Sequence, residues 1–276
     1  MTTPVPSLTL NNGVAMPRLG FGVFQVADDE ATAAVATALD AGYRSIDTAT
    51  IYGNEAGTGR ALAASGIARE ELFLTTKLWN ADQGRAETLA AFDASLERLG
   101  LNYVDLYLIH WPAPANDRYL ASWEALEEIY ASGRARAIGV SNFEPEYLDR
   151  ILATGGTVPA VNQVELHPAF AQSRVRAANA AHGIATEAWS PLAQGGAVLR
   201  DPAIEAIARR LDRTPAQVVL RWHVQQDRIA IPKSVTPARI RENLAIWDFE
   251  LSPADLLAID ALDSAGRIGP HPADVN

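Results

Sequence analysis

Short apolar runs alternate along this chain with longer segments that have the periodicity of amphipathic helices. The run at 104–109 is apolar on both alternating faces apart from Asp105, which is typical of a parallel strand covered on both sides. Between the runs, Leu120, Trp123 and Leu126 recur at the spacing of one helical face. Eight runs are predicted to be strands, and they span residues 19–24, 45–47, 72–77, 104–110, 135–140, 160–166, 185–189 and 229–231.

Eight strands, each followed by a helix, predict a (β/α)₈ TIM barrel of class α/β. No linker rich in Ser or Gly interrupts the pattern, so we expect one domain over residues 1–276. The alternative is a doubly wound open sheet. Its dinucleotide-binding fingerprint G-x-G-x-x-G follows no predicted strand here, which removes the best reason to prefer that fold.

Helix starts are marked by a capping side chain placed before a proline. Gln217, three residues after Thr214, completes a capping box. Helices at 201–211 and 214–225 both fall between the seventh and eighth strands, and one at 252–262 follows the eighth helix, so we expect two extra helices. Segments 8–10 and 14–16, joined by Asn-Asn-Gly, predict an N-terminal β-hairpin. The four capping pairs are Asp201-Pro202, Thr214-Pro215, Thr236-Pro237 and Ser252-Pro253.

Composition excludes several functions. The 276 residues carry a net charge of −10, which repels nucleic acid backbones and anionic lipid surfaces. The chain has no cysteine, so thiolate nucleophiles, disulfides and cysteine-ligated metals are ruled out. No secretory leader or stretch of about 18 apolar residues is visible. We therefore expect a cytoplasmic protein, a monomer that acts on a small molecule.

Lysine is rare in this chain. Of the 23 basic residues, only Lys77 and Lys233 are lysines. Because an ammonium and a guanidinium are not interchangeable at a bonded site, a chain that otherwise uses arginine marks these two positions as candidates for a specific role.

Polar residues end three of the predicted strands, at Asp47, Lys77 and His110, and Tyr52 follows Asp47 by five residues. In such barrels the reactive groups lie at the carboxyl ends of the strands. An adjacent ammonium stabilises a phenolate, so Lys77 is expected to lower the pKa of Tyr52, while Asp47 keeps the lysine charged. His110 can donate a hydrogen bond to the oxygen that Tyr52 protonates. This group is suited to protonating a carbonyl oxygen while hydride reaches its carbon.

Two other functions are compatible with these residues. Lys77 is also a strand-end barrel lysine, as in a Schiff-base aldolase. The chain could equally be a non-catalytic, cofactor-binding regulatory module of the same fold. Taken singly, an Asp–Lys pair at a strand end is as often a structural ion pair as a catalytic one. The convergence of all four residues is what favours catalysis.

A phosphate site is predicted after the eighth strand. The segment 233–237 places the Lys233 ammonium, two hydroxyl groups and the N-terminus of the next helix together, and Arg239 lies in the first turn of that helix. Barrels often bind phosphate at this position and after the seventh strand.

Six motifs together resemble the aldo-keto reductase superfamily over nearly the whole chain. They are Gly42-Tyr-Arg-Ser-Ile-Asp47-Thr-Ala, Tyr52-Gly-Asn-Glu, Thr75-Thr-Lys77-Leu-Trp79, Leu108-Ile-His110-Trp111-Pro, Gly139-Val-Ser-Asn-Phe and Ile231-Pro-Lys233-Ser. Within that family the chain is most similar to bacterial 2,5-diketo-D-gluconate reductases, through Gly20-Phe-Gly-Val-Phe24, Trp189-Ser-Pro-Leu and His271-Pro-Ala-Asp-Val.

The resemblance implies an NADPH-dependent reductase of aldehydes, keto acids or keto sugars such as 2,5-diketo-D-gluconate, with no metal and with NADH as a weaker cofactor. It implies the catalytic tetrad Asp47, Tyr52, Lys77 and His110, with Tyr52 as general acid. Thr236 and Ala193 depart from the family, which often has a basic residue and a glycine there. Implied cofactor-binding residues are Ser141, Asn142, Gln163, Trp189, Ser190, Leu192, Gln194, Gly195, Lys233, Ser234, Val235, Thr236, Arg239, Glu242 and Asn243. Implied substrate-contacting residues are Phe24, Trp79, Trp111 and His271.

Overall fold

The computed structural model describes residues 5–276, so residues 1–4, the beginning of the predicted domain 1–276, lie outside the described residues. Eight parallel strands follow one another around the sheet in chain order. The sheet closes where Leu19 bridges Ala230 and the Gly20 amide donates to the Ala230 carbonyl at 2.9 Å. The predicted barrel is therefore confirmed. Its strands are β3 (Phe21–Gly22), β4 (Ser45–Asp47), β5 (Phe73–Leu78), β6 (Val104–Ile109), β7 (Ala135–Ser141), β8 (Val161–Glu165), β9 (Ala185–Trp189) and β10 (Ile229–Ala230).

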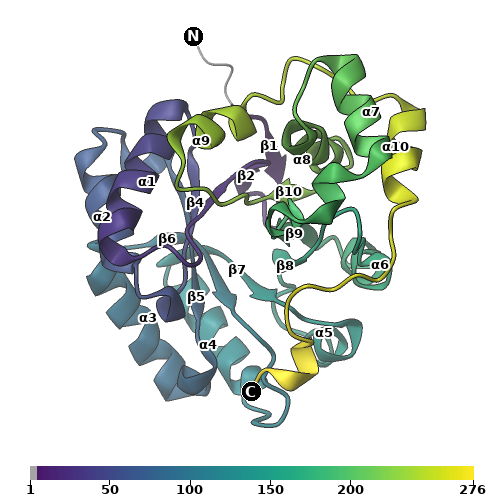
Figure 1. Cartoon of the computed structure of the whole chain (residues 1–276). Helices are drawn as coiled ribbons and strands as arrows, with labels where there is room; N and C mark the ends of the chain where they lie inside the picture. Colours follow the sequence, from purple (N-terminus) through teal and green to yellow (C-terminus); the bar gives the residue numbers. More distant parts are fainter. Residues whose placement is uncertain (1–4) are drawn as a thin grey trace.

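Helices surround the strands, as Figure 1 shows with α1 in purple and α7 and α8 in green. Their apolar faces pack on the outside of the barrel, where side chains such as Phe92 and Trp123 are buried against strand residues such as Ile46. The extra helices are present at the predicted places. The helices are α1 (Asp28–Ala41), α2 (Glu55–Ala64), α3 (Arg85–Leu99), α4 (Tyr119–Ala131), α5 (Pro145–Leu152), α6 (Ser173–Ala181), α7 (Pro202–Leu211), α8 (Pro215–Gln225), α9 (Pro237–Leu244) and α10 (Pro253–Asp260).

Three of the four predicted caps form. Asp201 accepts a hydrogen bond from the Ala203 amide, and Thr214 and Ser252 each form a capping box. The prediction for Thr236 was wrong, because its side chain makes no capping bond to α9. Instead, Ser234 Oγ accepts from the Thr236 amide at 3.1 Å, which organises the chain just before the helix and leaves the first amides of α9 without a side-chain acceptor.

The N-terminal hairpin closes one end of the barrel. The predicted hairpin is present, with strands β1 (Ser7–Thr9) and β2 (Ala15–Pro17) each displaced by one residue from the predicted segments, and Leu8 lies opposite Met16. Buried Leu10 and Met16 pack against Leu106 and Ile229 inside the barrel. Any site within the barrel must therefore open at the other end, where the strands finish.

Candidate active site

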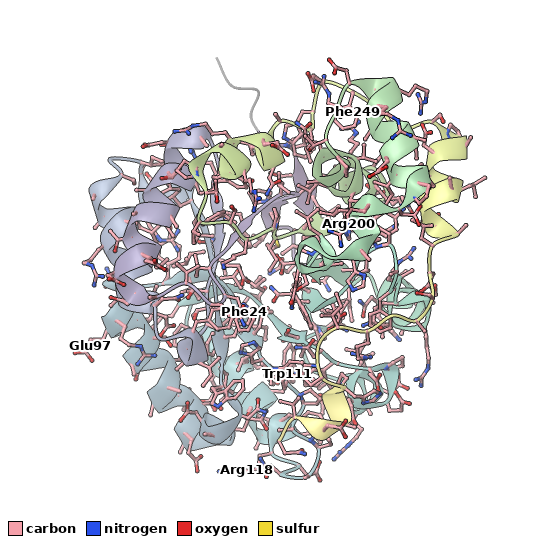
Figure 2. All side chains as sticks on the ribbon, viewed as in Figure 1. Phe24, Glu97, Trp111, Arg118, Arg200 and Phe249 are labelled. Carbon is pink, nitrogen blue, oxygen red and sulfur yellow. The ribbon has the colours of Figure 1, made fainter. Side chains whose placement is uncertain are left out.

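A cavity of about 1150 Å³ opens at the carboxyl ends of the strands. It extends from the loops after β3, β4 and β5, across the barrel mouth, to the start of α9. Figure 2 labels Phe24 and Trp111, which both line it. The structure brings almost all of the predicted residues to this one cavity, with Lys77 and His271 as the exceptions.

Lys77 lies beneath the cavity floor in a dry environment. Its side chain is fully buried, and Nζ donates to Asp47 Oδ1 at 2.5 Å and to the Thr48 carbonyl at 2.9 Å. Burial alone lowers the pKa of Lys77, but the charges of Asp47, Tyr52 and Glu187 and the hydrogen bond to Asp47 together outweigh it, and the pKa lies above its ordinary value. The lysine is therefore a permanent cation held in place by its neighbours.

Tyr52 ends a short 3-10 helix, Thr50–Tyr52, that brings the loop after β4 back over the mouth. The return is fixed by buried Asn54, whose side-chain amide donates to the carbonyls of Val23 and Val26 at 2.9 and 2.8 Å. Lys77 Nζ then lies 5.2 Å from the centroid of the Tyr52 ring. The tyrosine is thus next to the ammonium, as the sequence predicts.

Opposing effects set the pKa of Tyr52, and the predicted lowering by Lys77 is the smaller of them. Burial raises the pKa of the phenol above 10.0, and the charges of Asp47 and Glu187 add to this effect. The Lys77 ammonium does lower the pKa, but by less than the other contributions raise it. Tyr52 is therefore a neutral phenol near pH 7, which is the form required of a proton donor.

His110 lies beside Tyr52, with 5.6 Å between the two ring centroids. Burial and the Lys77 charge hold the pKa of the imidazole well below its ordinary value. A neutral imidazole carries one N–H and can donate a hydrogen bond without adding charge to the site. This is the property that the predicted role in binding a carbonyl oxygen requires.

A network of amides and hydroxyls orients the middle of the cavity. Asn142 Nδ2 donates to the His110 carbonyl at 3.0 Å, and Asn142 Oδ1 accepts from the Trp189 indole at 2.8 Å. Ser141 Oγ donates to the Gln163 carbonyl at 2.9 Å. The broad face of Trp189 is therefore held in a fixed orientation at the end of β9.

A buried carboxyl group adjoins the tetrad and was missed from the sequence. Gln163 Nε2 donates to Asp47 Oδ2 and to Glu187 Oε2, both at 2.8 Å. Glu187 is 1% exposed and lies in the middle of β9. An acidic residue inside a short buried strand is the signal that could have identified it.

The far end of the cavity carries two cations. Lys233 and Arg239 are exposed in the cavity wall, and neither forms an ion pair with any residue between 5 and 276. Ser234, Val235 and Thr236 line the wall between them, and Glu242 and Asn243 line it one turn further along α9. In a protein of net charge −10, two unpaired cations on one wall indicate a site for an anion.

The loop after β9 has a conformation that glycine would adopt more easily. Ser190, Ala193 and Gln194 have φ of 47°, 49° and 54°, followed by Gly195 at 75°. Ala193 is the position where the family usually has glycine, and its left-handed backbone explains that preference. The strain holds successive loop residues along the cavity wall.

The predicted aromatic mouth forms, but His271 does not contribute to it. Phe24, Trp79 and Trp111 line the cavity, whereas His271 lies outside it, with Nε2 3.5 Å from Glu144 Oε1. The C-terminal segment instead contributes residues that sequence reasoning did not single out, namely Ile268, Gly269, Pro270 and Val275.

Buried Glu165 fixes that C-terminal segment across the mouth. Its two carboxylate oxygens accept from the backbone amides of Ile268 and Gly269 at 2.6 and 2.8 Å. Burial raises the pKa of Glu165, but hydrogen bonds from His167 and these amides lower it more. In Figure 1 the segment runs in yellow from α10 across the mouth to the C-terminus.

Residues 5–276 contain neither a metal-binding cluster nor a membrane-spanning helix. No group of three or more His, Cys, Asp or Glu side chains in that range is arranged to hold a metal ion. In the same range, no helix has both the length and the apolar character needed to span a bilayer.

Comparisons with known proteins place the chain in a family. The model of the aldo/keto reductase family matches residues 18–264. An aldo-keto reductase of Mycolicibacterium smegmatis is 54% identical over 271 residues, covering 98% of each chain. Methylglyoxal reductase DkgA of Yersinia pestis is 51% identical, covering 98% of this chain and 97% of the relative.

A solved structure agrees with these matches. A variant of Gox0644 in complex with NADPH superposes with a TM-score of 0.95 at 46% identity, covering 99% of this chain and all of that one. The family predicted from the sequence is therefore confirmed. This chain belongs to the aldo/keto reductase family.

Proposed function

We propose that this protein is an NADPH-dependent reductase that converts carbonyl groups to alcohols, with Tyr52 as general acid. The observation that carries this proposal is that one cavity holds two kinds of group. At one end a neutral phenol lies beside a buried Lys–Asp pair and a neutral imidazole. At the other end lie two unpaired cations. Protonation of a carbonyl oxygen and recognition of a phosphorylated cofactor require these two ends.

The residues present fit a dinucleotide that carries an extra phosphate. Lys233 and Arg239 would hold the 2′-phosphate, and the loop from Ser190 to Gly195 would follow the pyrophosphate. Trp189 offers an aromatic face to the nicotinamide, with Ser141, Asn142 and Gln163 at its carboxamide. The bound cofactor supplies the hydride. The complex of Gox0644 with NADPH supports this assignment.

The tetrad residues divide the remaining work. Tyr52 donates its proton to the carbonyl oxygen, and His110 donates a hydrogen bond to the same oxygen. Lys77 stabilises the phenolate that Tyr52 becomes, because a positive charge lies close to the ring. Asp47 keeps Lys77 charged and fixes the position of its ammonium group.

The substrate end of the cavity favours an uncharged compound. Phe24, Trp79, Trp111 and Ile268 line this end, and within residues 5–276 the lysine and the arginine that line the cavity, Lys233 and Arg239, both lie at its far end. A substrate carboxylate would lose its hydration without gaining a counter-charge, which is costly. Of the predicted substrates, this favours aldehydes and neutral ketones over keto acids and over 2,5-diketo-D-gluconate.

Paired substrates that differ only in charge test both parts of this proposal. Oxidation of NADPH is followed by absorbance with ethyl pyruvate and with pyruvate, and with NADH in place of NADPH. We expect kcat/KM for the ester to exceed that for the acid by at least about tenfold, which corresponds to 1.4 kcal/mol. Absence of turnover with any aldehyde or ketone would refute the reductase, and a preference for pyruvate would refute only the substrate class.

The structure gives no support to the aldolase alternative. A Schiff base needs a neutral lysine that a substrate can reach, whereas Lys77 is fully buried and ion-paired. The regulatory module stays an alternative only if the turnover assay is negative.

A further inference from the structure

Glu187 is the one acidic residue of β9, and its neighbours belong to the catalytic group. It is the register partner of Gln163 on β8 and of Ile229 on β10. Its side chain is buried, and it does not line the cavity. None of the roles proposed for the tetrad residues involves Glu187.

The position of Glu187 determines how the Gln163 amide is oriented. Gln163 Nε2 has two hydrogens, and it donates to Asp47 Oδ2 and Glu187 Oε2 at 2.8 Å each. The carbonyl oxygen is then the remaining polar atom of this side chain, which lines the cavity. The reverse orientation would place that oxygen against the Asp47 carboxylate, which has no hydrogen to donate. Asp47 therefore fixes which end of the amide faces a ligand, and Glu187 accepts the second N–H and holds the amide in that position.

The charges around Glu187 favour its neutral form. The titratable groups that act on Glu187 or respond to it are Asp47 on β4, Lys77 on β5 and Tyr52 on the loop after β4. Lys77 is already neutralised by Asp47 at 2.5 Å, so a second carboxylate would leave a net negative charge in a dry interior. Glu187 Oε1 also has no hydrogen-bond partner among residues 5–276. Burial and the Asp47 charge raise the pKa of Glu187 to about 8.

We propose that Glu187 is a positioning residue: when neutral it holds Gln163 against Asp47, and when ionised it adds a negative charge that makes Tyr52 retain its proton. The Glu187 charge acts in the same direction as that of Asp47 and against that of Lys77. The effect on Tyr52 rests on the proposed function, whereas the protonation of Glu187 does not. The two parts can therefore be tested separately.

Thermal unfolding of the cofactor-free protein tests the protonation. Glu187 has an ordinary pKa of 4.5 when unfolded and about 8 when folded. An acid whose pKa is raised by folding stabilises the protein below its unfolded pKa, and this stability is lost as pH rises towards the folded pKa. In Glu187→Gln the loss is absent. The Tm of this variant minus that of the wild type should therefore rise by several degrees between pH 5 and pH 8.5, and then level off.

Glu55→Gln is the matched control. Glu55 is also buried, but it pairs with Arg98 and accepts from Thr76 Oγ1 at 2.6 Å, and it does not act on Tyr52. This substitution removes an ion pair, so the pH-dependent gain should not occur. A Tm difference for Glu187→Gln that stays constant from pH 5 to pH 9 would overturn the proposal, whatever the enzyme catalyses.

Alcohol oxidation with NADP⁺ tests the effect on Tyr52. Oxidation needs the phenolate as base, so its rate rises as Tyr52 loses its proton. In the wild type Glu187 is ionised in the alkaline range, and in Glu187→Gln that charge is gone. We expect the apparent pKa of kcat to fall by roughly 0.5–1 unit in Glu187→Gln and to stay unchanged in Glu55→Gln.

A third variant separates charge from positioning. Glu187→Leu also removes the charge, but it deprives Gln163 of a hydrogen-bond acceptor, whereas Glu187→Gln keeps one. We expect Glu187→Leu to show the same pKa shift and to bind NADPH more weakly than Glu187→Gln, as measured by fluorescence titration. An unshifted oxidation profile in both variants, with the Tm effect present, would refute the action on Tyr52 and leave both the protonation and the reductase assignment standing.

Discussion

Replacing Lys77 by methionine is expected to destabilise the fold as well as to abolish catalysis. The ammonium is fully buried, lies 2.5 Å from Asp47 Oδ1 and also donates to the Thr48 carbonyl. Methionine is unbranched and only one atom shorter than lysine, but it leaves the Asp47 carboxylate in a dry interior without its cation. Removing one partner of a buried ion pair costs roughly 3–5 kcal/mol. Since a folded domain is stable by about 5–15 kcal/mol, this is a large share of the total.

The carboxylate left without a partner can be removed by a second substitution. Asp47→Asn keeps the shape of the side chain but has no charge to bury. In the double variant, Asp47→Asn with Lys77→Met, the loss of stability should therefore be much smaller than the sum of the two single losses. Equilibrium urea unfolding at pH 7, followed by tryptophan fluorescence, gives the free energy of unfolding of all four proteins.

Two results would contradict this reasoning. A loss below about 1 kcal/mol for Lys77→Met is the value of an exposed ion pair and would mean that water reaches Asp47 in the folded protein. Losses that simply add in the double variant would mean that the two charges do not stabilise each other. Lys77→Arg is a control for charge alone. It keeps the positive charge, but its planar guanidinium cannot replace an ammonium in this space.

Three more variants test the rest of the site. Tyr52→Phe should lower kcat by at least roughly 10²–10⁴-fold while the Kd for NADPH stays the same. Retention of most of the activity would show that the Tyr52 phenol is not the general acid. Arg239→Ala should weaken NADPH binding at least about tenfold and leave NADH nearly unchanged in fluorescence titrations, and the loss should shrink as salt rises. Gly269→Ala would place a Cβ 2.5 Å from the Trp189 ring, so substrate KM should rise, whereas Gly266→Ala, with its nearest neighbour at 3.2 Å, should not change it.

The sequence predicts most of the barrel because its signals are local. Short apolar runs identify every strand of the barrel, and Thr214 with Gln217 forms the capping box that its spacing predicts. The first predicted strand, 19–24, is shortened to Phe21–Gly22, because on the closing side it forms one isolated bridge, Leu19 with Ala230, and Pro232 has no N–H to continue the ladder. Thr236 makes no side-chain capping bond, and the local bond that forms instead joins its own amide to Ser234 Oγ, two residues earlier.

The parts of the site that sequence reasoning misses depend on contacts between distant segments. Nothing near Ile268 indicates that its amide will bond to Glu165, 103 residues earlier in the chain. The same holds for Glu187, whose significance depends on Gln163 reaching Asp47 across the barrel. The direction of the Tyr52 pKa could not be predicted either, because it depends on how much burial outweighs one ammonium.

The hairpin at the closed end of the barrel bears on how this protein can be diversified. Met16 and Leu10 fill the barrel below an apolar layer, and the polar layer of Lys77 and Gln163 lies toward the open end. Substitutions at well-separated sites without shared partners add nearly independently. A library of stabilising changes in the hairpin can therefore be selected for heat resistance alone and afterwards combined with any set of mouth variants, without repeating the search for each new substrate.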